Sequence, residues 1–268
     1  MLLALKLVLV PAFLAALPAA ARAWGPSVAG WLAGLPVVAG PIVLLLALER
    51  GPGFAAQASV ASIAAIAAAE AFNLAYAWTC RRFNWPVALV VGMAGWFGSA
   101  LLLVRLPGSL GWAVAAACAA VVVSQSSLPR ASGRVPVSRV GRADLAVRML
   151  AGALLTLAVT TLSASMGAAW SGVLSVFPLL GSVLAVSAQR EHGADFVALL
   201  TRGMVIGRGS FAAFFAVTAT MLPQYGVAAS FACAAVVSVV VQGLTRRMLA
   251  APSSERAARE VAAGPRAG

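Results

Sequence analysis

Long apolar runs separated by short polar breaks cover almost the whole chain. Most runs are about 20 residues long, which is the length an α-helix needs to cross a bilayer. The breaks hold helix-ending residues, as in Gly51-Pro52-Gly53 and Leu106-Pro107-Gly108. The pattern therefore predicts an all-α, polytopic transmembrane helical bundle. The nine expected spans are residues 2–22, 26–48, 54–80, 85–105, 109–128, 144–165, 168–189, 194–221 and 225–248.

A segment near the N-terminus recurs 142 residues later without a gap. The matched pairs are Gly25 and Gly167, Gly30 and Gly172, Pro36 and Pro178, Glu49 and Glu191, and Gly51 and Gly193. Apolar matches between membrane segments are common, but Gly, Pro and Glu in one register are not. The first four spans match the sixth to ninth, and the fifth is a connector. A repeat displaced by five spans enters the membrane from the opposite face, so we expect an inverted repeat, an arrangement typical of transporters.

Charge predicts the orientation of the spans. Of the residues, 62% are hydrophobic and only 10% are charged, whereas soluble domains have about 25% charged residues. The net charge of +12 comes from arginines clustered between the apolar runs, as the positive-inside rule requires, and no nucleic-acid partner is expected. We expect a multi-pass protein of the bacterial inner membrane, with a periplasmic N-terminus and a cytoplasmic C-terminus.

Four parts follow from this orientation. Residues 1–128 hold the first repeat and the connector helix, and residues 129–143 form a basic cytoplasmic linker. Residues 144–248 form the second, inverted repeat, and residues 249–268 are expected to be a disordered cytoplasmic tail. Residues 1–23 also resemble a signal peptide that ends in Ala-x-Ala. A retained helix is favoured because its counterpart in the second half is internal; a mature N-terminus at Trp24 would contradict this.

Each half resembles the small GlpM-like bacterial inner-membrane proteins. The resemblance rests on the Gly-x-Leu-x-x-x-Pro core of Gly30, Leu32 and Pro36, and on an acidic residue and a glycine that close the same helix, Glu49 and Gly51. The second half keeps Gly172, Leu174, Pro178, Glu191 and Gly193. The resemblance implies an inner-membrane helical bundle made by fusing two such units, and it implies no particular reaction.

One polar stripe runs along the third span. It consists of Ser59, Ser62, Ile66, Glu70 and Asn73, whose spacings of 3, 4, 4 and 3 place them on one helical face. A charge near mid-bilayer costs about 2.5–3.5 kcal/mol and rarely persists without a partner.

The eighth span carries the basic candidates, Arg202 and Arg208. Glu70 and Arg208 lie roughly 15 and 20 Å from the cytoplasmic ends of their spans, so we expect a contact between them. Arg202 lies closer to the surface, where its side chain can reach water, and is the weaker candidate. Gly203, Gly207 and Gly209, around Arg208, resemble the spacing of a helix-packing motif more than a phosphate loop.

Two roles are open for the Glu70–Arg208 pair. It can be a structural clamp between the halves, or Glu70 can exchange protons while Arg208 binds an anionic group. Pro36 and Pro178 are expected to kink or break their spans, either to line a substrate site or as tolerated kinks. Glu49 and Glu191 are candidate gate residues, with helix capping as the alternative. His192 is expected in a solvated turn.

These patterns predict a secondary transporter or permease for a small solute, which can be anionic. A noncatalytic membrane scaffold or regulatory subunit is the alternative, and a homodimer is compatible with either. No enzyme is expected, because the sequence has no GxSxG, HExxH or phosphate-loop motif. Neither a metal site nor a cofactor is expected. The predicted substrate or ion site holds Glu70, Asn73, Arg202, Arg208, Pro36 and Pro178.

Overall fold

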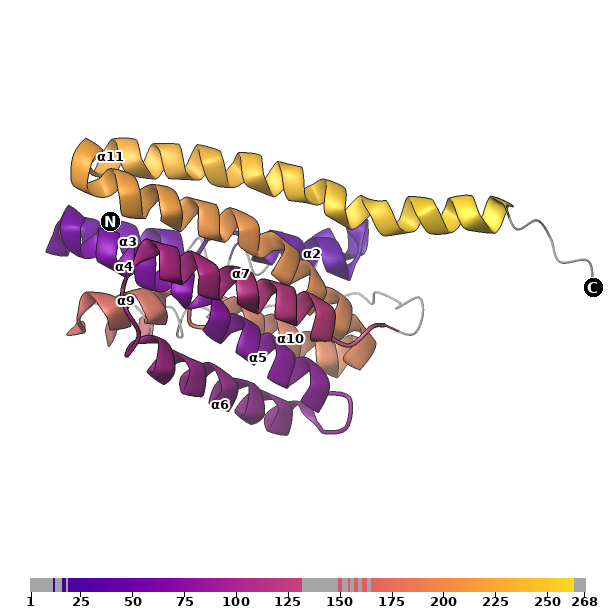
Figure 1. Ribbon diagram of the computed structural model, residues 1–268. Helices are drawn as coiled ribbons and strands as arrows, with labels where there is room; N and C mark the ends of the chain where they lie inside the picture. Colours follow the sequence, from indigo (N-terminus) through magenta and orange to yellow (C-terminus); the bar gives the residue numbers. More distant parts are fainter. Residues whose placement is uncertain are drawn as a thin grey trace, which may run out of the picture.

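The computed structural model is a bundle of helices (Figure 1). It describes residues 12, 16–17, 19–131, 149–150, 154, 157–158, 161–162 and 165–262, with side chains up to residue 246. The helices are α2 (Pro26–Ala33), α3 (Ala39–Arg50), α4 (Pro52–Ala64), α5 (Ile66–Thr79), α6 (Trp85–Leu103), α7 (Leu110–Ser127), α9 (Ala168–Ser175), α10 (Leu179–His192) and α11 (Ala194–Ala262). Within these residues there is no strand, so the all-α prediction is confirmed.

Five segments of the described chain are long and apolar enough to cross a membrane. They are Pro52–Thr79, Trp85–Leu103, Leu110–Ser127, Ala168–His192 and Ala194–Arg246. The last segment is two helices that meet at Gly226, where φ is 76° and the chain turns back on itself (Figure 1). The predicted first span, 2–22, and sixth span, 144–165, fall mostly outside the described residues. Helix α11 continues to Ala262, into the part for which the sequence predicts a disordered tail.

The bounds of the helices repeat along the chain. Helix α2 begins at Pro26 and α9 begins 142 residues later at Ala168, and both are 8 residues long. Helices α3 and α10 each end at a glycine with positive φ, Gly51 at 91° and Gly193 at 83°. Glycine suits both turns because an L side chain is strained in that conformation. The repeat in the sequence is therefore also a repeat in local structure.

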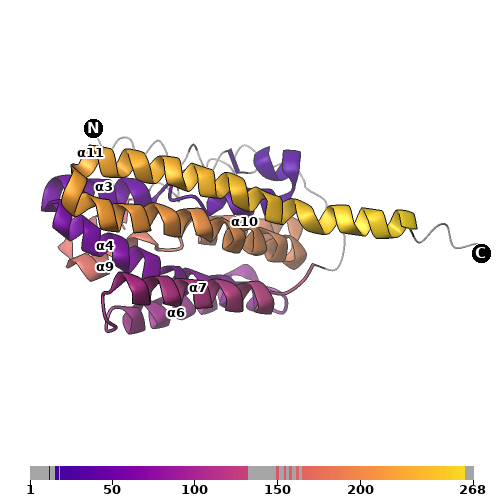
Figure 2. The same cartoon turned by 45° about the horizontal axis from the view of Figure 1, so that its top comes forward.

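Helices α6, α7 and the second half of α11 lie on the outside of the bundle (Figure 2) and carry many of its exposed apolar side chains. Large side chains such as Val90, Leu102, Val122 and Val239 are more than half exposed there. The small residues of α4 and α5 are buried against α6, α7 and α9. A bundle with a packed, small-residue interior and a contiguous apolar exterior fits hydrocarbon better than water as its solvent.

Two close helix crossings use glycines at equivalent positions of the repeat. A Cβ added to Gly30 on α2 would lie 1.9 Å from the carbonyl oxygen of Leu200 on α11. A Cβ added to Gly172 on α9 would lie 2.2 Å from the carbonyl oxygen of Ala58 on α4. Gly172 and Leu200 are each 142 residues beyond Gly30 and Ala58, so each short helix packs on the long helix of the other half.

The α2–α11 crossing has glycines on both sides. A Cβ at Gly203 would lie 2.0 Å from the Ser27 carbonyl oxygen, and one at Gly207 would lie 2.4 Å from that of Trp31. The helix-packing role predicted for Gly203 and Gly207 is thus confirmed. Backbones this close are typical of helix pairs in membranes, where small residues permit van der Waals contact between main chains.

Alanine at Gly30 or Gly203 is expected to destabilise the protein by about 1–3 kcal/mol, because the two helices must separate to admit a methyl group. The matched control is Gly98→Ala on α6, where nothing lies within 4 Å of an added Cβ. That change should be neutral or slightly stabilising, since Ala favours helix more than Gly. Thermal unfolding of the purified variants in detergent measures the difference. Equal effects at Gly98 and Gly30 would contradict the close crossing.

Candidate functional site

Prolines break two helices in the same way. Pro36 follows α2 and Pro178 precedes α10, and each has no amide hydrogen to continue a helix. In the first break, Leu35 N donates to Leu32 O at 3.1 Å and Gly40 N donates to Pro36 O at 2.9 Å. The equivalent bonds in the second break join Phe177 N to Leu174 O at 2.9 Å and Ser182 N to Pro178 O at 2.7 Å. The helix breaks predicted at the two prolines are confirmed.

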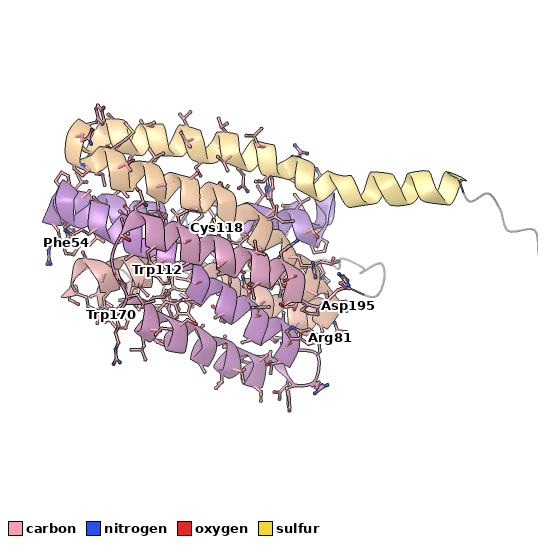
Figure 3. The ribbon with its side chains drawn as sticks, in the orientation of Figure 1. Phe54, Arg81, Trp112, Cys118, Trp170 and Asp195 are labelled. Carbon is pink, nitrogen blue, oxygen red and sulfur yellow. The ribbon has the colours of Figure 1, made fainter. Side chains whose placement is uncertain are left out.

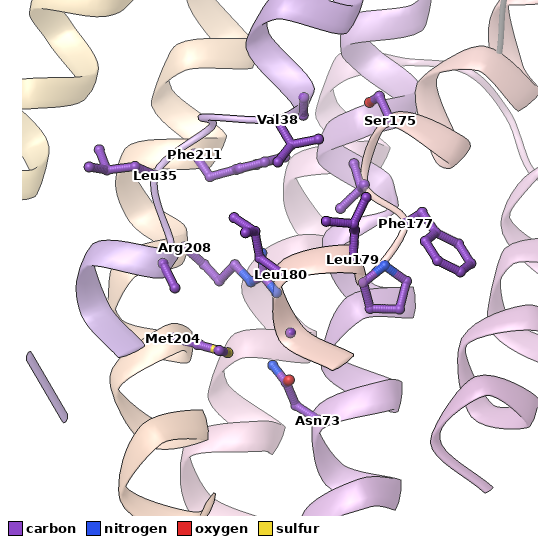
Figure 4. A pocket seen from close by; sticks show the side chains of 15 residues that line it. Leu35, Val38, Asn73, Ser175, Phe177, Leu179, Leu180, Met204, Arg208 and Phe211 are labelled. Carbon is purple, nitrogen blue, oxygen red and sulfur yellow. The ribbon is translucent and has the colours of Figure 1, made fainter. Parts of the chain in front are cut away.

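Both breaks border one small cavity (Figure 4). Its volume is about 50 Å³, enough for a few water molecules or one small ion. The apolar lining includes Leu35, Val38, Val176, Pro178, Met204 and Phe211, and the polar lining includes Asn73, Ser175 and Arg208. Pro36 does not itself line the cavity, although its neighbours do. Two segments far apart in the sequence thus meet around a space that holds a cationic side chain.

A buried ion pair lies beside this cavity. Arg208 Nε on α11 donates to Glu70 Oε1 on α5 at 2.8 Å, and Asn73 Nδ2 donates to Glu70 Oε2 at 3.1 Å. The Glu70 side chain is 1% exposed and the Arg208 side chain 13% exposed. The contact predicted between Glu70 and Arg208 is therefore present. Both carboxylate oxygens accept a hydrogen bond, as a buried charge requires.

The ion pair uses only one of the three guanidinium nitrogens. Among the described residues, the two terminal nitrogens of Arg208 have no hydrogen-bond partner, and Figure 4 shows them near the middle of the cavity beside Leu180. The Arg208 guanidinium also lies over the Phe211 ring, 5.9 Å from its centre. Arg208 therefore has its charge balanced by Glu70 while its two terminal nitrogens remain available to a ligand.

Helix ends of both signs meet at the cavity. Val38 and Ala39 stand at the start of α3, and Leu180 and Gly181 lie in the first turn of α10. The first amides of a helix have no intrahelical acceptor, and the N-terminal end of the helix carries about half a positive charge. The C-terminal ends of α2 and α9 reach the same breaks with their carbonyls. The partial charges of the helix ends therefore oppose one another, as the full charges of Arg208 and Glu70 do.

Hydroxyl groups join the halves next to the cavity. Ser62 Oγ on α4 donates to Gly172 O on α9 at 3.1 Å and lies 2.9 Å from Ser175 Oγ. Thr218 Oγ1 on α11 donates to Ser59 Oγ at 3.0 Å. The sequence stripe pointed to Ser59 and Ser62, but it missed Ser175 and Thr218. Only Ser175 carried a signal, since it ends the helix just before the second proline break.

Arg202 does not belong to the cavity. Its guanidinium donates to Gln125 O at 3.2 Å, to Pro129 O at 3.1 Å and to Leu128 O. These carbonyls lie at and just after the end of α7, where the helix dipole favours a cation. Arg202 and Arg208 therefore have different neighbours, because six residues along a helix turn the two side chains to different sides, and a binding role for Arg202 stays a prediction.

The candidate gate residues lie away from the cavity, at the ends of their helices. Glu49 is exposed in the last turn of α3, and α4 begins after it without a side-chain cap. Glu191 Oε2 lies 3.9 Å from His192 Nδ1 at the end of α10. The gate role of either carboxylate remains a prediction.

The solvated position predicted for His192 is wrong. Its side chain is 5% exposed, and its ring stacks on that of Phe196 with centroids 4.3 Å apart. The turn at Gly193 between α10 and α11 folds the imidazole back onto the first turn of α11. Across the described residues, no three His, Cys, Asp or Glu side chains gather into a group that could hold a metal ion.

Removing one member of the ion pair should cost more than removing both. Glu70→Leu alone leaves the Arg208 charge buried without its partner and is expected to destabilise the protein by about 3–5 kcal/mol. The double variant Glu70→Leu/Arg208→Met removes both charges and should recover most of that loss. Arg105→Met, at an exposed arginine, is the control and should have little effect. Thermal unfolding in detergent and the amount accumulated in membranes are the measurements; additive effects of the two single changes would contradict a coupled pair.

The chain was compared with known protein families, curated proteins and solved structures. No protein-family model, curated protein or solved structure matches this chain. The GlpM-like pattern of each half thus stays a prediction from its residues.

Proposed function

We propose that the protein is a noncatalytic secondary transporter or permease of the bacterial inner membrane that moves a small solute through the cavity between the two helix breaks. The observation that carries this proposal is the convergence of both breaks on one cavity with an arginine inside it. In transporters, discontinuous helices line midplane sites because their freed backbone groups can bind solute and ions.

An inverted repeat would let such a cavity open to either side. The reciprocal packing of Gly30 on Leu200 and of Gly172 on Ala58 supports a two-fold relation between the halves. Figure 1 draws α2 and α10 toward the end from which the C-terminal helix projects, and α3 and α9 toward the end where α11 turns back. These positions support equivalent helices that run in opposite directions, and hence antiparallel halves and alternating access by rocking.

The two ends of the bundle suggest how it sits in the membrane. Figure 3 shows Arg81 and Asp195 at the end of the bundle from which the C-terminal helix projects, and Phe54 and Trp170 toward the other end. Arg81 Nη1 and Asp195 Oδ1 are 3.4 Å apart, and both side chains are about one-third exposed. Trp residues are enriched at both membrane–water interfaces, so Trp170 marks an end of the membrane-spanning part. Arginine-rich connections lie on the cytoplasmic side. We infer that the end with Arg81 faces the cytoplasm.

A noncatalytic scaffold or regulatory subunit is the second candidate. The hydroxyl pairs Ser62–Ser175 and Ser59–Thr218 favour it, since these polar groups already bond to one another between helices. A cavity of about 50 Å³ is also small for a transported organic molecule. The uncommitted nitrogens of Arg208 favour transport, because a scaffold needs no cation with free donors.

Reporter fusions test the inverted repeat at its two equivalent glycines. Alkaline phosphatase is active outside the cytoplasm and green fluorescent protein is fluorescent inside it. A fusion after Gly51 should therefore give phosphatase activity, and a fusion after Gly193 should give fluorescence. Fusions after Asn84, on the expected cytoplasmic side, calibrate the signals. The same reporter response at Gly51 and Gly193 would overturn the antiparallel arrangement.

Thiol labelling distinguishes transport from scaffolding without knowledge of the solute. Cys80, Cys118 and Cys233 are first replaced, and Ser175→Cys or Met204→Cys then places one thiol in the cavity. Alternating access predicts that a membrane-impermeant reagent reaches this thiol from each side of oriented vesicles. Ser230→Cys, buried on α11 and not among the residues that line the cavity, should stay protected. Protection of the cavity thiols from both sides would favour the scaffold.

A further inference from the structure

We propose that the cavity binds one small monovalent anion on the two terminal nitrogens of Arg208, and that Glu70 takes up one proton as the anion binds. This inference names the solute class of the site and rests on the proposed function for its role in transport. The ligand chemistry is that of a halide, a nitrate ion or a carboxylate as small as formate.

The binding geometry follows from how Glu70 holds the guanidinium. Nε of Arg208 donates to Glu70 Oε1 at 2.8 Å, which anchors that edge of the guanidinium on the carboxylate. The two terminal nitrogens then form an outward fork that faces the cavity. A planar pair of N–H donors is the arrangement that binds carboxylate and other oxyanions with two parallel hydrogen bonds, and it also suits a single halide. Glu70 and Asn73 act here as positioning residues for Arg208.

The size of the cavity limits the anion. A space of about 50 Å³ has room for one small ion or a few waters, so a sugar acid or a nucleotide does not fit. The apolar walls from Leu35, Val38 and Phe211 strip water from whatever enters. This loss of hydration favours an anion of low charge, because the free energy of desolvation rises steeply for multiply charged ions. First-turn amides of α10, at Leu180 and Gly181, can supply further donors.

Charge balance requires the proton. Without ligand, Arg208 and Glu70 are a neutral pair, so an added anion would leave one net negative charge in an apolar interior. The charged groups on the helices around the pair do not compensate it. Within their spans α4, α6 and α7 carry no Asp, Glu, Lys or Arg, and Arg202 on α11 is bound to the carbonyls after α7. The charged ends of α3 and α10, and Asp195, lie at the ends of the bundle.

Protonating Glu70 restores neutrality. One proton from water converts its carboxylate to a carboxylic acid, and Arg208 then pairs with the anion alone. Asn73 can serve both states of Glu70. Its Nδ2 donates to Oε2 of the carboxylate at 3.1 Å. After a rotation of the amide, its Oδ1 can accept the proton of the carboxylic acid. The transported unit is then one anion with one proton, which crosses the bilayer without net charge.

Anion-dependent stability of the purified full chain tests the binding step. Sodium gluconate, whose anion is too large for the cavity, is replaced at constant ionic strength by sodium chloride, nitrate or formate. At least one of these anions should raise the unfolding temperature, because a ligand that binds only the folded state stabilises it. Its apparent affinity should rise by up to about tenfold for each pH unit lowered while Glu70 is ionised in the anion-free protein, because one proton is bound with each anion.

Two variants separate the parts of the proposal. Arg208→Lys keeps a cation beside Glu70 but lacks the pair of terminal N–H donors. The apparent affinity for the anion should therefore fall by about tenfold or more. Glu70→Gln leaves the arginine unbalanced, so it should bind the anion more tightly at neutral pH and without dependence on pH. Equal anion effects in wild type and Arg208→Lys, or no effect of any of the three anions on wild type, would overturn the site. A change in unfolding temperature that depends on whether the cation is sodium or choline, and not on which anion is present, would also overturn the site.

A direct proton measurement needs only protein that folds. Adding the effective anion to weakly buffered wild-type protein should raise the pH of the solution by uptake of about one proton per chain, and Glu70→Gln should take up none. Anion binding with no proton uptake overturns the coupling. These assays are done in detergent and do not depend on transport. If the anion binds but the cavity thiols are protected from both sides, the proposed transport function is contradicted and the anion site is supported. If the thiols are reached from each side but no anion changes the unfolding temperature, transport is supported and the anion site is contradicted.

Discussion

The neutral pair of Glu70 and Arg208 in an apolar interior is the constraint on which the rest of the structure depends. A single charge at this depth costs about 2.5–3.5 kcal/mol even on lenient scales, so each side chain requires the other. The pair joins α5 to α11 at 2.8 Å and thereby fixes one half of the chain against the other. It also leaves the two terminal nitrogens of Arg208 without a hydrogen-bond partner among the described residues, because only Nε is used. One interaction thus serves both the clamp and the site.

Small residues make this pairing reachable. The α2–α11 crossing at Gly30, Gly203 and Gly207 brings main chains into direct contact, and Gly172 does the same between α9 and α4. With larger residues the helices would stand farther apart, and the two broken segments would not border a common cavity. The prolines have the complementary effect. Each interrupts a helix where its neighbours are tightly packed, so the break stays inside the bundle and borders the cavity between neighbouring helices.

Much of the site could be predicted from residue types and spacing. The stripe from Ser59 to Asn73 showed which face of its helix is buried, and the depth of Glu70 required a basic partner. Arg208 was identifiable because it lies deep in its span. The partners of Arg202 could not be predicted, because spacing along a helix does not reveal that the end of α7 offers three carbonyls nearby. His192 was misplaced for a similar reason, since polarity alone did not show the Phe196 ring beneath it.

The sequence by itself determined the helical class, the 142-residue repeat and the positions of both helix breaks. Those depend on local chemistry: apolar run length, glycine and proline. The tertiary structure decided that the two breaks meet, that Ser175 and Thr218 join the polar contacts, and that the terminal nitrogens of Arg208 face a cavity of about 50 Å³. These outcomes depend on how helices distant in sequence cross and rotate against one another, which is set by packing between side chains that no local pattern records.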